Sequence, residues 1–126
     1  MKTPNEVLLI SIAITFASCS PTVTTSLSQN YPPLDYDQEV MVFHLDQNQP
    51  KQAVVLGEVK IGDSGFSINC GYPVVLKKAK LEARKLGGNA IKIIKHKLPH
   101  PLGSTCHRIT AIILRVENID EYEASR

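Results

Sequence analysis

The chain has 126 residues, of which 43% are hydrophobic and 21% charged, enough for one small domain and no more. Its 14 basic and 12 acidic residues give a net charge of +2, but the two signs are segregated along the sequence. Acidic residues dominate 20–69, basic residues dominate 70–115, where Glu82 is the single acid, and residues 116–126 are acidic again. The basic segment predicts an anionic neighbour such as lipid headgroups, lipopolysaccharide phosphate or an acidic protein surface, with a solvated helix face as the alternative.

Residues 1–18 are typical of an export signal. The apolar stretch 7–17 is too short to cross a bilayer as a mature helix, and it ends in small residues. The segment Phe16-Ala17-Ser18-Cys19 resembles the lipobox of bacterial lipoproteins. That resemblance implies cleavage before Cys19 and acylation of its thiol and new N-terminus, for example with palmitate. Glu6 departs from the basic start of such signals, and a plain secretory signal or a buried apolar helix are the alternatives.

The other two cysteines follow from this assignment. The chain has three cysteines, and lipidation of Cys19 leaves Cys70 and Cys106 as an even pair. Exported domains fold in an oxidising compartment, so we expect Cys70 and Cys106 to form a disulfide.

After the signal, residues 19–35 are rich in Ser, Thr, Pro and Gln and show no periodicity, which predicts a flexible, lipid-anchored tether. The folded domain is expected over 36–118. Residues 39–45 and 53–61 are predicted strands, and Gly57 within the second indicates a bulge or a close packing contact.

The main helix is predicted over residues 73–86. Pro73 suits a first helical position, and Gly87-Gly88 supplies a left-handed C-terminal stop. Apolar residues at helical spacing form one stripe, made of Val75, Leu76, Ala79, Ala83 and Leu86. The basic residues lie off this stripe and form the predicted anion- or partner-binding face, made of Lys77, Lys78, Lys80, Arg84 and Lys85.

Residues 89–98 and 108–116 are rich in β-branched side chains and predict a hairpin. The expected fold is therefore a small single α+β domain, β-β-α-β-β, with one main helix packed on an antiparallel or mixed sheet. Residues 119–126 are expected to form an acidic tail.

Short motifs of this domain resemble the YbjQ-like and RcsF-like small α/β domains. They are Leu56-Gly57-Glu58-Val59, a cysteine (Cys70) before an alanine-bearing helix, and Leu86-Gly87-Gly88-Asn89-Ala90-Ile91, within residues 54–116. RcsF-type proteins are outer-membrane lipoproteins of envelope-stress signalling, with a disordered linker and a disulfide-stapled domain. The resemblance implies that architecture here, although RcsF carries four domain cysteines and this domain has two.

A zinc or copper site is an alternative function. Four histidines and two cysteines supply the soft ligands that these metals prefer; they are His44, His96, His100, His107, Cys70 and Cys106. Exposed loop histidines are the simpler interpretation. The sequence has no nucleophile elbow, phosphate-binding glycine loop or CxxC motif, so we expect neither an enzyme nor a cofactor.

We therefore expect a non-catalytic binding or signalling module of the bacterial envelope, which binds the membrane through its lipid and an envelope protein or anionic lipid through its domain. Ser20 follows the acylated cysteine in place of the aspartate that retains lipoproteins in the inner membrane, which favours the outer membrane facing the periplasm. Nucleic acid is not an expected partner of an exported chain. A redox or stress sensor, a metal-binding protein and a structural subunit of an envelope complex are the alternatives.

Overall fold

A computed structural model describes residues 22–27, 31–62, 70–103 and 105–125. The expected signal peptide and Cys19 lie outside the described residues. None of the helices in the described part of the chain has the length and apolar character that crossing a bilayer requires.

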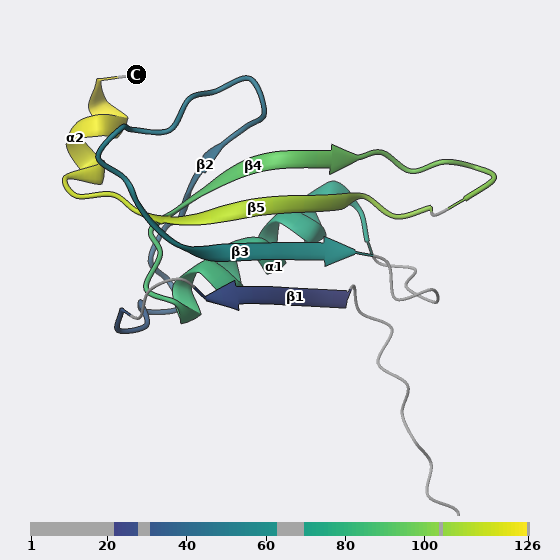
Figure 1. Cartoon of the computed structure of the whole chain (residues 1–126), viewed down its shortest axis with the longest axis horizontal. Helices are drawn as coiled ribbons and strands as arrows, with labels where there is room; N and C mark the ends of the chain where they lie inside the picture. Colours follow the sequence, from purple (N-terminus) through teal and green to yellow (C-terminus); the bar gives the residue numbers. More distant parts are fainter. Residues whose placement is uncertain (1–21, 28–30, 63–69, 104, 126) are drawn as a thin grey trace, which may run out of the picture.

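The fold is a two-layer α+β domain in which a mixed sheet carries the main helix on one face (Figure 1). The elements in chain order are β1 Thr22–Leu27, β2 Met41–Phe43, β3 Val54–Gly62, α1 Tyr72–Lys85, β4 Ala90–Lys97, β5 Arg108–Arg115 and α2 Ile119–Ala124. The strand order is β1-β3-β5-β4-β2; β2 runs parallel to β4, and the other neighbouring pairs are antiparallel. The predicted β-β-α-β-β arrangement and the β4–β5 hairpin are confirmed.

The structure differs from the predicted tether at β1. Thr22–Leu27 pairs antiparallel with β3, from Thr22 opposite Gly62 to Leu27 opposite Gly57. These residues include β-branched threonine and valine, which favour strands, and Val23 packs against the core. Backbone hydrogen bonds between antiparallel strands do not depend on the polarity of the side chains. The polar composition of this segment, from which the tether was predicted, therefore did not exclude a strand.

The hydrophobic core lies on both faces of the sheet because successive strand residues point to opposite sides. On the α1 side, Val75, Ala79 and Ala83 pack against residues such as Ile113, so the predicted apolar stripe is the buried face of α1. A second, smaller cluster occupies the opposite face and contains Met41, Phe43, Ala90, Leu114 and Val116.

The predicted boundary signals of α1 are confirmed. Pro73 lies in its first turn, and Gly87 directly after its C-cap has a φ of +79°. A Cβ atom on Gly88 would lie 2.5 Å from the Ile113 Cγ2 atom, so the sheet packs directly under this position. The expected irregularity at Gly57 is also found, since the register of β3 against β5 shifts between Val55 and Gly57.

The predicted acidic tail contains the short helix α2. It begins after Asn118, whose φ of 52° is left-handed, and it packs Ile119 and Tyr122 against the second core cluster. The Phe43 and Tyr122 rings meet edge to face at 5.6 Å between centroids. This contact places α2 beside β2, at one end of the molecule (Figure 1).

Candidate binding site at the open edge of the sheet

Three of the five predicted anion-binding residues on α1 have partners within the domain. The Lys80 Nζ atom forms an ion pair with Glu39 Oε1 at 2.7 Å, and the Arg84 Nε atom donates to the Gln38 carbonyl oxygen at 2.7 Å. Lys85 pairs with Glu82 on the same helix at 2.7 Å. Lys80 and Arg84 thus fasten the segment before β2 onto α1.

The other two, Lys77 and Lys78, have no hydrogen bond or ion pair with any residue that the structure describes. They line a shallow depression of about 360 Å³ with Tyr36, whose ring lies 6.0 Å from the Arg84 guanidinium carbon. The structure therefore leaves a smaller basic surface for an external anion than the sequence indicated, and anion binding there stays a prediction.

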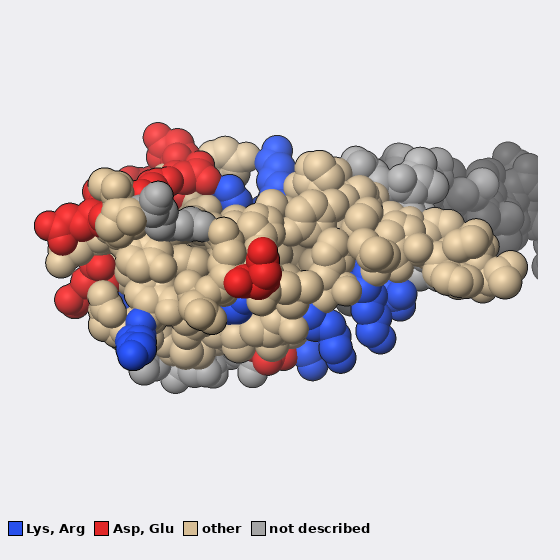
Figure 2. Space-filling view, turned by 90° about the horizontal axis from the view of Figure 1, so that it is seen from above, with Lys and Arg blue, Asp and Glu red and all other residues tan. Residues whose placement is uncertain are grey.

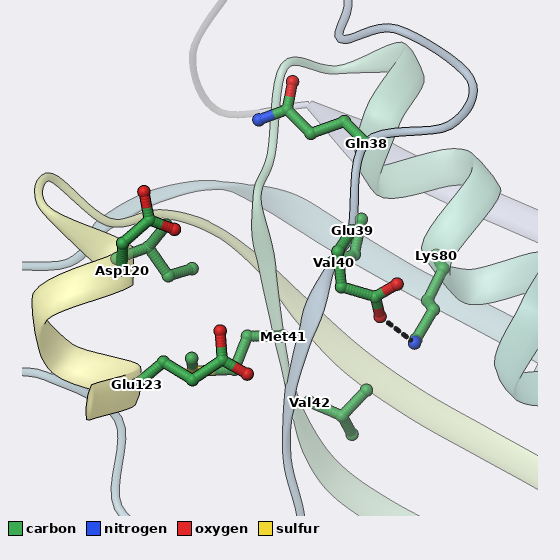
Figure 3. A pocket seen from close by; sticks show the side chains of 9 residues that line it. Gln38, Glu39, Val40, Met41, Val42, Lys80, Asp120 and Glu123 are labelled. Atoms are coloured by element: carbon green, nitrogen blue, oxygen red, sulfur yellow. Dashed lines mark hydrogen bonds and ion pairs between the residues drawn. The ribbon is translucent and has the colours of Figure 1, made fainter. Parts of the chain in front are cut away.

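A groove of about 370 Å³ runs along the free side of β2, between α1 and α2 (Figure 3). Val40 directly precedes β2 and Met41 is its first residue, and both side chains are buried. Val42, the next residue of β2, is half-buried. Lys80 and its partner Glu39 form the α1 wall, and Ile119, Asp120 and Glu123 form the α2 wall. Met41 and Val42 lie on the edge strand that separates the two walls.

The hydrogen-bonding pattern of β2 shows which of its backbone groups face the groove. Met41 N–H donates to the Asn89 carbonyl at 3.0 Å, so Met41 and Phe43 face β4 in the parallel ladder. Backbone groups of an edge strand alternate in direction, and the N–H and C=O of Val42 therefore face away from β4. The described residues provide no hydrogen-bond partner for these two groups.

Asp120 and Glu123 determine the net charge of this groove. The hydrogen bond from Lys80 and its positive charge hold the pKa of the Glu39 carboxyl below its usual value, so this pair stays ionised and mutually neutralised. No described residue forms an ion pair with Asp120 or Glu123. Figure 2 shows acidic residues gathered at the end of the molecule that carries α2.

Asn89 and Asn118 position the α2 wall. The buried Asn89 side chain donates from Nδ2 to the Val116 carbonyl and accepts from the Val116 N–H through Oδ1, both at 2.8 Å. These bonds fix the chain as it leaves β5, and the left-handed Asn118 then turns it into α2. Asparagine is one of the few residues other than glycine that adopts this conformation readily.

Three of the four histidines gather around Tyr72. The His96 Nε2 and His107 Nδ1 atoms are 2.9 Å apart, Tyr72 stacks on His96 with 4.8 Å between ring centroids, and the Tyr72 hydroxyl lies 3.2 Å from His44 Nδ1. Partial burial, followed by the charge of His107, lowers the pKa of His96. His100 lies apart in the hairpin loop, where its Nδ1 atom accepts from the Leu102 N–H.

Cys70 and Cys106 form the predicted disulfide. Both residues are buried, and their Cα atoms are 5.0 Å apart. The bond takes both sulfurs out of any metal site. Across the described ranges, no group of three or more His, Cys, Asp or Glu residues is arranged to hold a metal ion.

The sequence did not reveal the groove on the free edge of β2. Glu39, Met41 and Val42 were recognised only as a strand, and Asp120 and Glu123 were assigned to a tail. The available signal was Ile119 and Tyr122, two apolar residues at helical spacing within the acidic segment.

Comparisons with known proteins assign no relative to this chain. No protein-family model matches it, and no curated protein or solved structure does.

Proposed function

We propose that this chain is a lipoprotein of the bacterial envelope whose α+β domain is a non-catalytic binding module. The Cys70–Cys106 disulfide carries the proposal because it accounts for two of the three cysteines. The remaining one, Cys19, follows an apolar stretch and ends a lipobox-like segment. A disulfide also favours an oxidising compartment, where an exported protein folds.

Binding is favoured over catalysis by the character of the groove beside β2. It offers backbone groups at Val42 that have no partner within the part of the chain that the structure describes, an apolar floor, and the negative charges of Asp120 and Glu123. Backbone groups and apolar surface are the elements with which proteins recognise extended polypeptides. Signalling of envelope stress is the narrower proposal, supported by the RcsF-like motifs and by the order of lipobox, linker and stapled domain.

Two acyl chains are needed for stable membrane anchoring, because a single chain gives only marginal binding. We place the protein at the outer membrane, facing the periplasm, because Ser20 follows the acylated cysteine.

The test is metabolic labelling of bacteria that express the full chain with an alkyne-bearing fatty acid. We expect label on the wild-type protein and its recovery in the membrane fraction. Cys19→Ser should remove the label, while the matched Cys70→Ser/Cys106→Ser double variant should keep it. A wild-type chain without label would overturn the lipoprotein assignment.

A further inference from the structure

The free side of β2 has the geometry of a site for strand addition. β2 is the last strand in the sheet order, and its Val42 N–H and C=O face the groove without a partner among the described residues. An exposed strand edge is a template on which another extended segment pairs through backbone hydrogen bonds.

The walls of the groove restrict what fits there. Lys80 on α1 and Glu123 on α2 flank the edge from opposite sides (Figure 3). The groove therefore suits one extended strand between two helices. Its volume of about 370 Å³ falls in the range of about 300–1,000 Å³ that is typical of ligand sites.

The charge of the α2 wall favours a basic occupant. Asp120 and Glu123 are three residues apart on a helix, so they share a face, and both line the groove. On the opposite wall Glu39 is neutralised by Lys80, so the acids of α2 have no compensating charge among the described residues. If a second copy of the chain paired through the same edge, its Asp120 and Glu123 would approach the Asp120 and Glu123 of the first copy. Like charges in an interface repel, so this occupant is disfavoured.

From this arrangement we infer that the groove binds an extended lysine- or arginine-rich segment of another envelope protein, which adds as a strand to β2. Its backbone pairs with Val42, and its basic side chains meet Asp120 and Glu123. The inference rests on the proposed binding function and names the class of partner, and it does not depend on acylation of Cys19.

The first experiment measures fluorescence anisotropy of a labelled ten-residue peptide of alternating lysine and valine, titrated with the full chain in neutral detergent. We expect saturable binding that weakens with salt, and no binding of a glutamate–valine peptide. Two further lysine–valine peptides carry N-methyl groups on all the valines or on all the lysines. Because alternate amides face alternate sides of a strand, one methylated peptide should lose at least about tenfold in affinity and the other should bind almost normally.

The second experiment changes the protein. Asp120→Asn/Glu123→Gln should weaken binding of the lysine–valine peptide by about tenfold, because it removes the negative charges that α2 contributes to the groove. The matched control, Asp46→Asn/Glu58→Gln, makes the same change in net charge away from the groove and should alter affinity by less than about twofold. Val42→Pro removes the outward N–H without removing a hydrogen bond to β4, and it should also weaken binding.

Equal binding of both methylated peptides, together with equal affinities of the two double variants, would overturn the inference, because the contact would then be unspecific attraction between charges. The methylated peptides keep the test valid even if Val42→Pro does not fold. Failure of the strand-addition inference would leave the lipoprotein assignment intact, because that assignment depends on the fatty-acid label at Cys19. Loss of that label, in turn, would not affect the peptide titration.

Discussion

Gly87 lies where the end of α1 meets the segment that leads to β2. Its φ of +79° is left-handed, and a Cβ atom there would lie 2.5 Å from the Pro32 carbonyl oxygen and 2.7 Å from the Tyr31 Cβ atom. Both contacts involve atoms that cannot rotate away. Gly87 is therefore required by its conformation and also by the close approach of the chain at residues 31–32.

We expect Gly87→Ala to lower the free energy of unfolding by about 3 kcal/mol, as the sum of left-handed strain and a forced backbone shift. Urea denaturation of the full chain in neutral detergent, monitored by circular dichroism, measures this change in the free energy of unfolding. Gly103→Ala is the control, because its nearest neighbour, the His100 Cβ atom, is 4.0 Å away, and it should change stability by less than about 0.5 kcal/mol. Equal effects of the two substitutions would contradict the packing described at Gly87.

The environment of His96 predicts a dependence of stability on pH. Burial, and then the charge of His107, lowers the pKa of His96 from its ordinary value of 6.5. The folded state therefore binds a proton at His96 less readily than the unfolded state does. The stability associated with neutral His96 is present above pH 6.5 and is lost as the pH falls below that value through the folded-state pKa.

Unfolding free energies at pH 7.5 and pH 5 test this prediction when variants are compared, because any contribution of Glu39, whose folded-state pKa is also lowered, is common to the wild type and the histidine variants. We expect the wild-type chain to be less stable at pH 5, and His96→Gln to show a smaller loss. His100→Gln, in the hairpin loop, is the control and should behave like the wild type. An identical pH dependence in wild type and His96→Gln would refute the role of His96.

At the scale of elements, strong local signals made the main helix and four of the strands, β2 to β5, predictable. α1 has an apolar stripe, Pro73 at its start and Gly87 after its end, and each signal corresponds to a physical requirement found in the fold. β1 and α2 were missed because tertiary partners stabilise them. β1 depends on the backbone of β3, and α2 depends on Phe43 and its neighbours in the second core cluster.

The groove was unpredictable for the same reason. Its charge comes from α2 and its outward-facing backbone groups come from β2, and about 80 residues separate these segments in the sequence. The disulfide, in contrast, followed from counting cysteines and assigning one to lipid. Helical spacing correctly placed the five basic residues of α1 off the apolar stripe. It could not show that Lys80 and Arg84 bind the segment before β2, because that contact depends on the tertiary fold.

Tyr122 attaches α2 to the sheet. Its ring meets Phe43 edge to face, and a six-residue helix is too short to be stable without such packing. We expect Tyr122→Ala to lower the free energy of unfolding by about 2 kcal/mol and to weaken binding of the lysine–valine peptide, because Asp120 and Glu123 lose their fixed position. Glu121→Ala, an exposed change on the same helix, should cost less than about 1 kcal/mol. Urea denaturation measures the effect on stability, and the peptide titration measures the effect on binding. An unchanged free energy of unfolding in Tyr122→Ala would show that α2 does not depend on this contact.

At the scale of the whole molecule, the disulfide joins the start of α1 to the segment entering β5. Cys70 and Cys106 are 36 positions apart, and closing a loop of that length stabilises a domain by about 4 kcal/mol in the chain-entropy argument. For a domain of this size, about 4 kcal/mol is a large share of the total stability.

We therefore expect Cys70→Ser/Cys106→Ser to lower the unfolding free energy by about 4 kcal/mol, and Cys19→Ser to leave it unchanged. Denaturation of both variants without reductant provides the comparison. Addition of reductant should destabilise the wild type and have no effect on the double variant. A wild-type chain whose stability is insensitive to reductant under unfolding conditions would contradict a stabilising disulfide.

The central claim is that one cysteine carries lipid while the other two bond to each other. Top-down mass spectrometry of the full-length gene product, extracted from bacterial membranes without reductant, tests both parts in one spectrum. The expected species begins at Cys19, carries acyl chains on that residue, and is lighter by two hydrogens for the Cys70–Cys106 bond. A polypeptide that still begins at Met1, without acyl chains, would contradict the account.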